Sequence, residues 1–338
     1  MRSWRTFCIR NKRRFFAGLS LLTGFLFLLN LCLGAVYVPP GEILRILLGQ
    51  LPDTPQARIV LLARLPRACG CLLAGAALAA SGTVIQGVLH NPLAAPNIIG
   101  VNAGAGLAAA LWGAFLPEAA GLAPAAAFLG ALSGAFLVLF IAERTGASKM
   151  TLVLAGVAVS SMFGAAIDGV VTFVPDALNG YSDFRVGGVA NLSMARLIPA
   201  AWVILPALTV TLSLAGELDI LTLGTETARS LGLPAKRLRL ILLALAAAMA
   251  GGAVSFCGLL GFVGLIVPHI MRRLAGEESL PLLAASALGG AALLAACDLL
   301  SRILFAPYEL PVGIVLSLGG GPFFIWLLLR QRGGRTHD

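Results

Sequence analysis

The sequence contains three lysines, and none of them follows a glycine. They are Lys12, Lys149 and Lys236. A nucleotide-binding phosphate loop has the form GxxxxGK[ST], in which the lysine comes directly after a glycine. The chain therefore has no phosphate loop of this kind, and we expect that it does not hydrolyse ATP by itself.

Side chains that bind metals or act as catalysts are also scarce. None of the three histidines, His90, His269 and His337, lies in an HExxH motif or beside a cysteine. The six cysteines lie mostly within apolar runs, and we interpret them as packing residues. The sequence therefore predicts no enzyme activity, no resident cofactor and no metal site, and it makes an intramembrane enzyme the weakest interpretation.

Charge is sparse as well. Charged residues make up 12% of the chain, whereas soluble domains contain about 25%. Hydrophobic residues make up 59%, and the mean hydropathy is +0.94. Apolar runs of roughly 20 residues, the length of a membrane-spanning helix, recur along the chain. We therefore predict an all-α, polytopic membrane protein.

Ten apolar segments are predicted to cross the membrane. They are residues 15–38, 68–89, 98–116, 123–142, 150–174, 197–215, 240–257, 258–272, 280–300 and 311–329. The eighth is short for a crossing. It is counted because two basic cytoplasmic termini require an even number of crossings, and nine would place one basic cluster outside. We expect a single transmembrane domain over residues 1–338.

The net charge of +9 is spread over several loops and does not form one basic face. Of the 24 basic residues, 17 lie in five clusters between apolar segments, at residues 2–14, 144–149, 229–239, 272–273 and 330–335. Basic residues accumulate in cytoplasmic loops. We therefore predict that these loops and both termini are cytoplasmic, and that nucleic acid is not a partner.

One charged segment, LTLGTETARSLGLPAKRLRLILL at residues 221–243, interrupts the apolar pattern. We expect Thr225 to cap a short helix containing Glu226 and Arg229, because a threonine oxygen can accept a free backbone N–H. Gly232 is expected to end that helix, and Pro234 favours the start of the next. The segment therefore predicts a rigid pair of short helices rather than a plain linker.

Ionisable residues inside the predicted spans are few. Asp168 and Asp298 lie in spans, and both are near predicted outer ends. We interpret them as interfacial or helix-paired acids rather than as an ion relay. A secondary transporter working alone is therefore the weaker alternative from another functional class.

Several arginines lie on the predicted outer side. Arg45, Arg58, Arg64 and Arg67 precede the second span, and Arg302 lies between the last two. A guanidinium group can bind a carboxylate through two parallel hydrogen bonds. These arginines are interpreted either as membrane-interface anchors or as a docking surface for the carboxylates of an external partner.

Four stretches together resemble the FecCD family of permeases. They are residues 64–106, beginning RLPRACGCLLAG; the charged segment above; GFVGLIVPHIMRRL at 261–274; and ELPVGIVLSLGGGPFFIWLLLR at 309–330. The resemblance implies the ten-helix permease of a type II ABC importer for ferric siderophores, haem or cobalamin. Its implied partners are a second copy or a paralogous permease, two ATP-binding cassette ATPase subunits, an extracytoplasmic substrate-binding protein and membrane lipid. The implied location is the bacterial cytoplasmic (inner) membrane, and the leading cargo is a ferric siderophore.

The resemblance also implies roles for particular residues. Arginines that match Arg64, Arg67 and Arg302 receive acidic residues of the binding protein. The turn at Asn91, Pro92 and Leu93 resembles the segment that lines the cytoplasmic gate. Residues 217–239 resemble the coupling helices that seat in the ATPase, and the residues implied to carry the coupling are Thr225, Glu226, Ala228, Arg229, Ser230, Leu231 and Gly232.

Overall fold

The computed structural model describes residues 12–34, 36–50, 54–145, 149–304 and 308–332. Every regular element in these ranges is a helix, which confirms the predicted fold class. The predicted cytoplasmic placement of Arg2, Arg5, Arg10 and Arg335 falls outside the described residues.

The described part of the chain contains ten helices of at least 13 residues, and each corresponds to one predicted span. They are α2 (Lys12–Cys32), α5 (Leu65–Leu89), α6 (Val101–Phe115), α7 (Ala123–Arg144), α8 (Lys149–Phe173), α10 (Met194–Ser213), α13 (Ala235–Cys257), α14 (Val263–Ala275), α15 (Ser279–Ile303) and α16 (Val312–Arg332). Seven helices in the described residues are long and apolar enough to cross a membrane. The helices α6, α14 and α16 are not among these seven.

Shorter helices connect the long ones. They are α3 (Pro40–Leu47), α4 (Pro55–Arg58), η1 (Ile59–Arg64), η2 (Pro96–Ile99), η3 (Pro117–Leu122), α9 (Ala177–Val186), α11 (Ala215–Thr222) and α12 (Thr225–Ser230). The elements α4 and η1 run directly into α5, so helical structure there begins at Pro55. The predicted second span began later, at residue 68.

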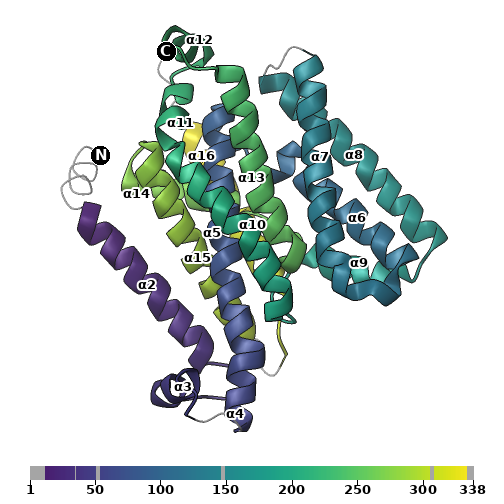
Figure 1. The fold of residues 1–338 in the computed structure, drawn as a ribbon, viewed down its shortest axis with the longest axis vertical. Helices are drawn as coiled ribbons and strands as arrows, with labels where there is room; N and C mark the ends of the chain where they lie inside the picture. Colours follow the sequence, from purple (N-terminus) through teal and green to yellow (C-terminus); the bar gives the residue numbers. More distant parts are fainter. Residues whose placement is uncertain (1–11, 35, 51–53, 146–148, 305–307, 333–338) are drawn as a thin grey trace.

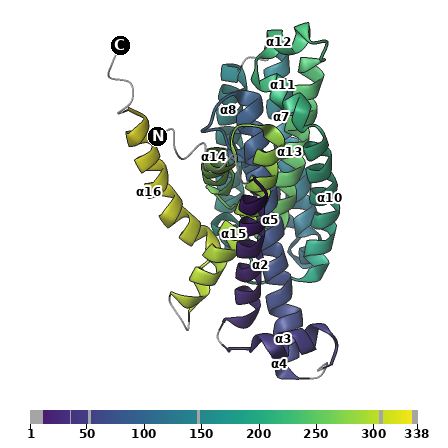
Figure 2. The same ribbon diagram turned by 90° about the vertical axis from the view of Figure 1, so that its left-hand side faces the viewer.

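The long helix α5 forms the centre of the bundle, and most of its side chains are buried. Figure 1 shows α2, α10, α13, α14 and α15 around it, while α6, α7, α8 and α9 form a neighbouring group. Figure 2 shows α16 projecting away from the bundle. The elements α11 and α12 lie at one end of the molecule and α3 and α4 at the other (Figure 1). We call these the α12 end and the α3 end.

Close helix crossings depend on glycine. On α6 and the residue before it, Gly104 and Gly100 face Gly130 and Gly134 of α7, and a Cβ atom at any of these four positions would meet the backbone of the opposite segment or a side chain on it. Both pairs have the GxxxG spacing that lets helix backbones approach closely in lipid. The bundle is therefore tightly packed at this crossing.

The first predicted span was too long. It extended to residue 38, but α2 ends at Cys32. Arg64 donates hydrogen bonds to the carbonyl oxygens of Leu31, Cys32 and Val36. These carbonyls therefore bind a guanidinium group from a distant helix, and the chain can leave the helical path without unsatisfied acceptors.

Candidate functional site

A buried charge cluster joins the start of α5 to the end of α15. Arg67 donates from Nε to both oxygens of Asp298, at 2.9 and 3.2 Å, and from Nη1 to Glu309 Oε2 at 2.7 Å. Arg302 lies one turn after Asp298 on α15 and approaches the same carboxylate at 3.2 Å. The Asp298 side chain is fully buried, whereas that of Glu309 is 44% exposed. Arg67 therefore holds one carboxylate in the interior and one at the surface.

Arg302 and Arg64 both reach the connection that follows α2. Arg302 donates to the carbonyl oxygens of Asn30 at 3.2 Å and Leu33 at 2.9 Å, and it also contacts the side-chain oxygen of Asn30. Arg64 binds three neighbouring carbonyls, as described above. Together with the pair between Arg67 and Asp298, these contacts fasten α2, α5 and α15 to one another at the α3 end.

The three arginines expected to dock a binding protein are therefore interior residues. Their exposed fractions are 6% for Arg64, 8% for Arg67 and 7% for Arg302. Each already has partners within the chain, so a docking role stays a prediction. Of the two acids within predicted spans, Asp298 is paired between helices as expected, while Asp168 is exposed on α8.

A cavity of about 690 Å³ opens beside this cluster. Its wall contains charges of both signs, from Arg67, Arg196, Asp176, Asp183 and Glu309. Pockets for drug-sized ligands commonly measure about 300–1,000 Å³. The cavity is therefore large enough to admit a small organic molecule or part of a larger one.

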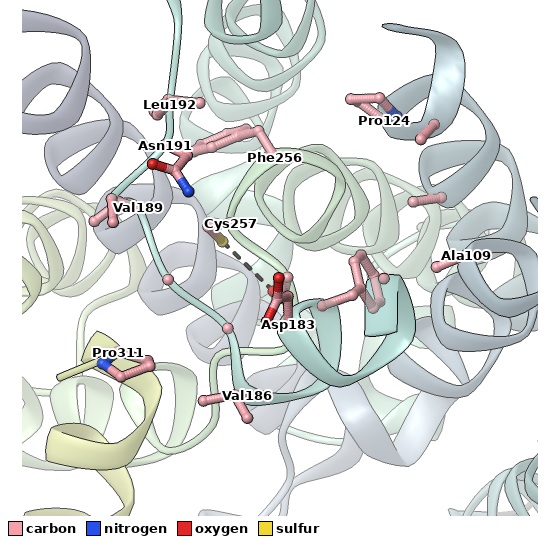
Figure 3. Close-up of a pocket in the computed structure, with 18 of the residues that line it drawn as sticks. Ala109, Pro124, Asp183, Val186, Val189, Asn191, Leu192, Phe256, Cys257 and Pro311 are labelled. Atoms are coloured by element: carbon pink, nitrogen blue, oxygen red, sulfur yellow. Dashed lines mark hydrogen bonds between the residues drawn. The ribbon is translucent and has the colours of Figure 1, made fainter. Parts of the chain in front are cut away.

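The rest of the cavity wall is mainly apolar. Figure 3 shows Asp183, Asn191, Phe256 and Pro311 around the space. Asp183 lies on α9, Asn191 in the segment before α10, Phe256 on α13 and Pro311 directly before α16. Tyr181 of α9 lies over Gly106 of α6. Burial raises the pKa of its hydroxyl group, and the nearby Arg185 opposes this shift.

Backbone hydrogen bonds hold α9 against the end of α13 at this cavity. The Gly188 N–H donates to the Cys257 carbonyl at 2.8 Å, and the Leu259 N–H donates to the Phe184 carbonyl at 2.9 Å. Gly187 has a φ of +72°, a conformation that favours glycine, and its position against Leu259 leaves little room for a side chain. The shape of this wall is therefore fixed by the main chain.

At the α12 end, a tight turn follows α5. His90 adopts a left-handed conformation with φ of 50°, and the Asn91 N–H bonds the Gln86 carbonyl at 3.1 Å. The Asn91 side chain then accepts from the Leu93 N–H at 3.0 Å, while Pro92 is exposed. The second span was predicted to end at residue 89, and the structure confirms this boundary. The gate role of Asn91, Pro92 and Leu93 stays a prediction.

The side chain of Gln86 connects this end of α5 to α14. It donates to the Gly264 carbonyl at 3.3 Å and accepts from Arg272 Nη1 at 3.2 Å. Gln86 is buried. The turn after α5 is therefore linked to the first arginine of the basic pair at the end of α14.

The helix α12 ends as the sequence predicted. Gly232 has a φ of +82°, the Gly232 N–H bonds the Arg229 carbonyl at 2.9 Å, and the Leu233 N–H bonds the Ala228 carbonyl at 3.0 Å. This pair of bonds is the Schellman motif. Pro234 then precedes α13.

The predicted cap at the start of this helix was wrong. Gly224 occupies the N-cap position, and no side chain caps the helix there. Thr225 is instead the first helical residue, and its hydroxyl accepts from Arg239 Nη2 at 2.9 Å. An arginine fourteen residues later in the chain therefore binds the oxygen that was expected to cap α12.

The other predicted coupling residues lie mostly at the surface. Those that are exposed are Glu226, Arg229, Ser230, Leu231 and Gly232, and Ala228 is buried. Glu226 and Arg229 form an exposed ion pair at 3.2 Å.

Two further contacts tie residues 217–239 to the bundle. Lys236 pairs with Glu143 at the end of α7 at 2.7 Å. Asp219 accepts from the Ser279 N–H at the start of α15 at 2.8 Å. Sequence reasoning did not single out Glu143, Asp219, Gln86 or Glu309, because each acts through a partner distant in the chain and no local motif marks it.

Comparisons with known proteins agree with this architecture. A model of the FecCD transport family matches residues 22–330. The Hemin transport system permease protein HmuU of Yersinia pestis is 40% identical over 283 residues, which are 81% of this chain and 84% of the relative. The Fe(3+)-citrate import system permease protein YfmE of Bacillus subtilis is 37% identical over 313 residues, 92% and 93% of the two chains. A solved structure described as an inward-facing, metal-chelate type ABC transporter has a TM-score of 0.81 at 27% identity, covering 94% of this chain and 99% of its own.

Proposed function

Because the chain belongs to the FecCD transport family, we propose that it is the permease subunit of an ATP-driven importer for a metal chelate. The observation that carries this proposal is the family match, which spans nearly the whole chain. The lack of a GxxxxGK[ST] phosphate loop in the sequence supports ATP hydrolysis on a separate subunit.

The distribution of charge supports an orientation. Arg144, Lys236, Arg272 and Arg273 belong to segments at the α12 end (Figure 1), so the positive-inside rule supports a cytoplasmic position for that end. The α3 end, with its cavity, then faces the outside of a bacterial cytoplasmic membrane. This arrangement supports docking of a substrate-binding protein at the α3 end, where Arg67 and Glu309 reach the cavity wall.

Residues 217–239 are suited to contact an ATPase subunit. In a complex of two permease chains and two ATPase subunits, each permease chain would offer one such segment. The Schellman motif at Gly232 gives α12 a defined end, and the ion pair of Lys236 with Glu143 connects the start of α13 to the end of α7. We infer that Asn91 and Leu93 narrow the inner end of the pathway between two copies, or between this chain and a paralogue. Cysteines at these positions are expected to form cross-links whose yield changes with bound nucleotide, and a constant yield would contradict the gate role.

The cargo is proposed by class. The names of the two relatives include hemin and Fe(3+)-citrate. Each of these compounds is iron bound by an organic ligand. A ferric siderophore is therefore the first candidate, with haem and cobalamin as the alternatives within the family.

Uptake by cells tests this proposal. A strain lacking this chain is compared with the same strain carrying it, using radiolabelled ferric hydroxamate, ferric citrate, haemin and cyanocobalamin. Restored uptake of one iron chelate supports the proposal. Restored uptake of cyanocobalamin alone identifies the alternative cargo, and no restored uptake of any of the four contradicts the proposal.

A further inference from the structure

The helix α15 begins without a cap from its own sequence. Its N-cap residue is Glu278, whose side chain makes no hydrogen bond to the free N–H groups of the first turn. The Ser279 N–H is instead bound by Asp219 Oδ1 at 2.8 Å. Asp219 lies on α11, sixty residues earlier in the chain. The start of α15 is therefore capped by another helix.

The side chain of Glu278 is engaged elsewhere. Its carboxylate pairs with Lys12 Nζ at the start of α2, at 2.7 Å. Both partners in that pair are well exposed, at 42% and 69% of their side chains. Ser279, by contrast, is 4% exposed. The bond from Ser279 to Asp219 is thus partly buried, with Ser279 in the interior and Asp219 half-buried, so it is less exposed to water than the pair of Lys12 with Glu278.

A carboxylate at this position is favourable for two reasons. It satisfies a backbone N–H that lacks an acceptor within the helix, and its negative charge lies at the positive end of the helix dipole. Moving α11 away from α15 would therefore leave a buried N–H group without a partner. This hydrogen bond therefore favours joint movement of α11 and the start of α15.

The other end of α15 is also fastened. Asp298 holds Arg67 of α5 and Arg302 of its own helix at the α3 end. Between the two ends α15 is an uninterrupted helix of 25 residues, packed on α5 where Gly290 meets Gly75. The helix therefore connects α11 at one end of the molecule to the buried charge cluster at the other.

We propose that Asp219 is a positioning residue for transport, which fastens α15 to α11 so that movement of residues 217–239 reaches the α3 end. This inference rests on the proposed function, because it takes residues 217–239 as the segment that follows the ATPase. It adds a link from that segment to α15, in addition to the direct chain connections to α10 and α13.

The test compares four variants in complexes reconstituted with the ATPase subunits and the binding protein. The probe is whichever of ferric hydroxamate, ferric citrate, haemin or cyanocobalamin the wild-type complex imports, and the measured quantity is probe imported per ATP hydrolysed. Asp219→Ala is expected to lower this ratio about tenfold, the size expected for one charge-assisted hydrogen bond. Asp219→Asn keeps an acceptor oxygen without the charge and is expected to lower it about twofold to threefold at an unchanged melting temperature. Glu278→Ala removes a neighbouring acid that does not cap the helix, and it should leave the ratio unchanged.

The fourth variant separates positioning from local helix stability. Asp219→Ala combined with Glu278→Ser gives α15 a serine cap of its own, which restores the helix start without restoring the link to α11. We expect its melting temperature to recover while the ratio stays low. Recovery of the ratio in this double variant would overturn the proposal, and so would a wild-type ratio in Asp219→Ala. If the alanine variant does not assemble, a wild-type ratio in Asp219→Asn would overturn it. A wild-type complex that imports no probe would contradict the proposed function instead.

Discussion

Arg67 and Asp298 are 231 positions apart in the chain, and they form an ion pair whose acid is completely buried. Arg302 shares the same carboxylate. One buried negative charge thus lies between two largely buried guanidinium groups, which makes Asp298 the residue on which this end of the bundle depends.

Replacing Asp298 is expected to destabilise the protein strongly. Asp298→Ala would leave the buried Arg302 without its carboxylate and Arg67 paired to the partly exposed Glu309, and breaking a buried pair in this way costs about 3–5 kcal/mol. The measurement is thermal unfolding of the purified protein in detergent. Asp168→Ala is the matched control, because Asp168 is an exposed acid near the same end of another long helix. Equal melting temperatures for the two variants would contradict the role of Asp298.

Replacing Glu309 is expected to affect docking more than stability. Its ion pair with Arg67 is partly exposed, and exposed pairs contribute about 0–1 kcal/mol. If Arg67 receives a carboxylate from the binding protein, Glu309 competes for the same guanidinium group. Glu309→Gln is therefore expected to tighten binding of that protein about twofold to fivefold, as measured by surface plasmon resonance. Glu118→Gln, at another exposed acid, serves as the control. Unchanged or weaker binding by the Glu309 variant would argue against docking at Arg67.

The crossing of α5 and α14 is expected to tolerate no side chain at Gly82. A Cβ atom there would clash with the carbonyl of Gly264, so Gly82→Ala must push the two helices apart. We expect a loss of about 1–3 kcal/mol, the usual cost of overpacking, measured by thermal unfolding. Gly164→Ala on α8 has open space around the new methyl group and should be neutral or slightly stabilising. A stable Gly82→Ala variant would mean that the crossing is looser than described.

The order of the helices and their glycine crossings could be predicted from the sequence. Apolar runs and the GxxxG spacing are local patterns, and Gly100, Gly104, Gly130 and Gly134 meet as that spacing suggested. The end of α12 at Gly232 is equally local, because one residue with a positive φ sets it. These features depend on neighbours within a few turns of the same helix or helix pair.

The burial of Arg64, Arg67 and Arg302 could not be predicted in the same way. Their partners are backbone carbonyls at and just after the end of α2, and acids on α15 and before α16. No spacing in the sequence connects these residues. The cap expected from Thr225 failed for a related reason, because its hydroxyl accepts from Arg239 on the following helix. Tertiary contacts decide which partner a polar side chain binds. The local sequence shows only which kinds of hydrogen bond or ion pair that side chain is able to form.

The end of α12 is expected to matter for coupling. Gly232 has a positive φ, and no atom would obstruct a side chain there, so Gly232→Val acts through backbone strain of at least about 1–2 kcal/mol. We expect ATP hydrolysis by the assembled complex to continue while uptake falls severalfold. Gly216→Val on α11 also points into open space but has no positive φ, and it should retain coupling. Normal uptake in the Gly232 variant would contradict a coupling role for α12 and would favour its interpretation as a membrane-surface anchor.

The source of energy tests the central claim most directly. The chain is placed in proteoliposomes with and without its ATPase subunits, in the presence of the binding protein, and uptake of the radiolabelled chelate is followed with internal ATP or with an imposed proton or sodium gradient. The account predicts uptake that requires both ATP and a catalytically active ATPase, and that is insensitive to either gradient. Uptake by the chain alone, driven by a gradient without ATP, would contradict the importer assignment and identify a secondary transporter.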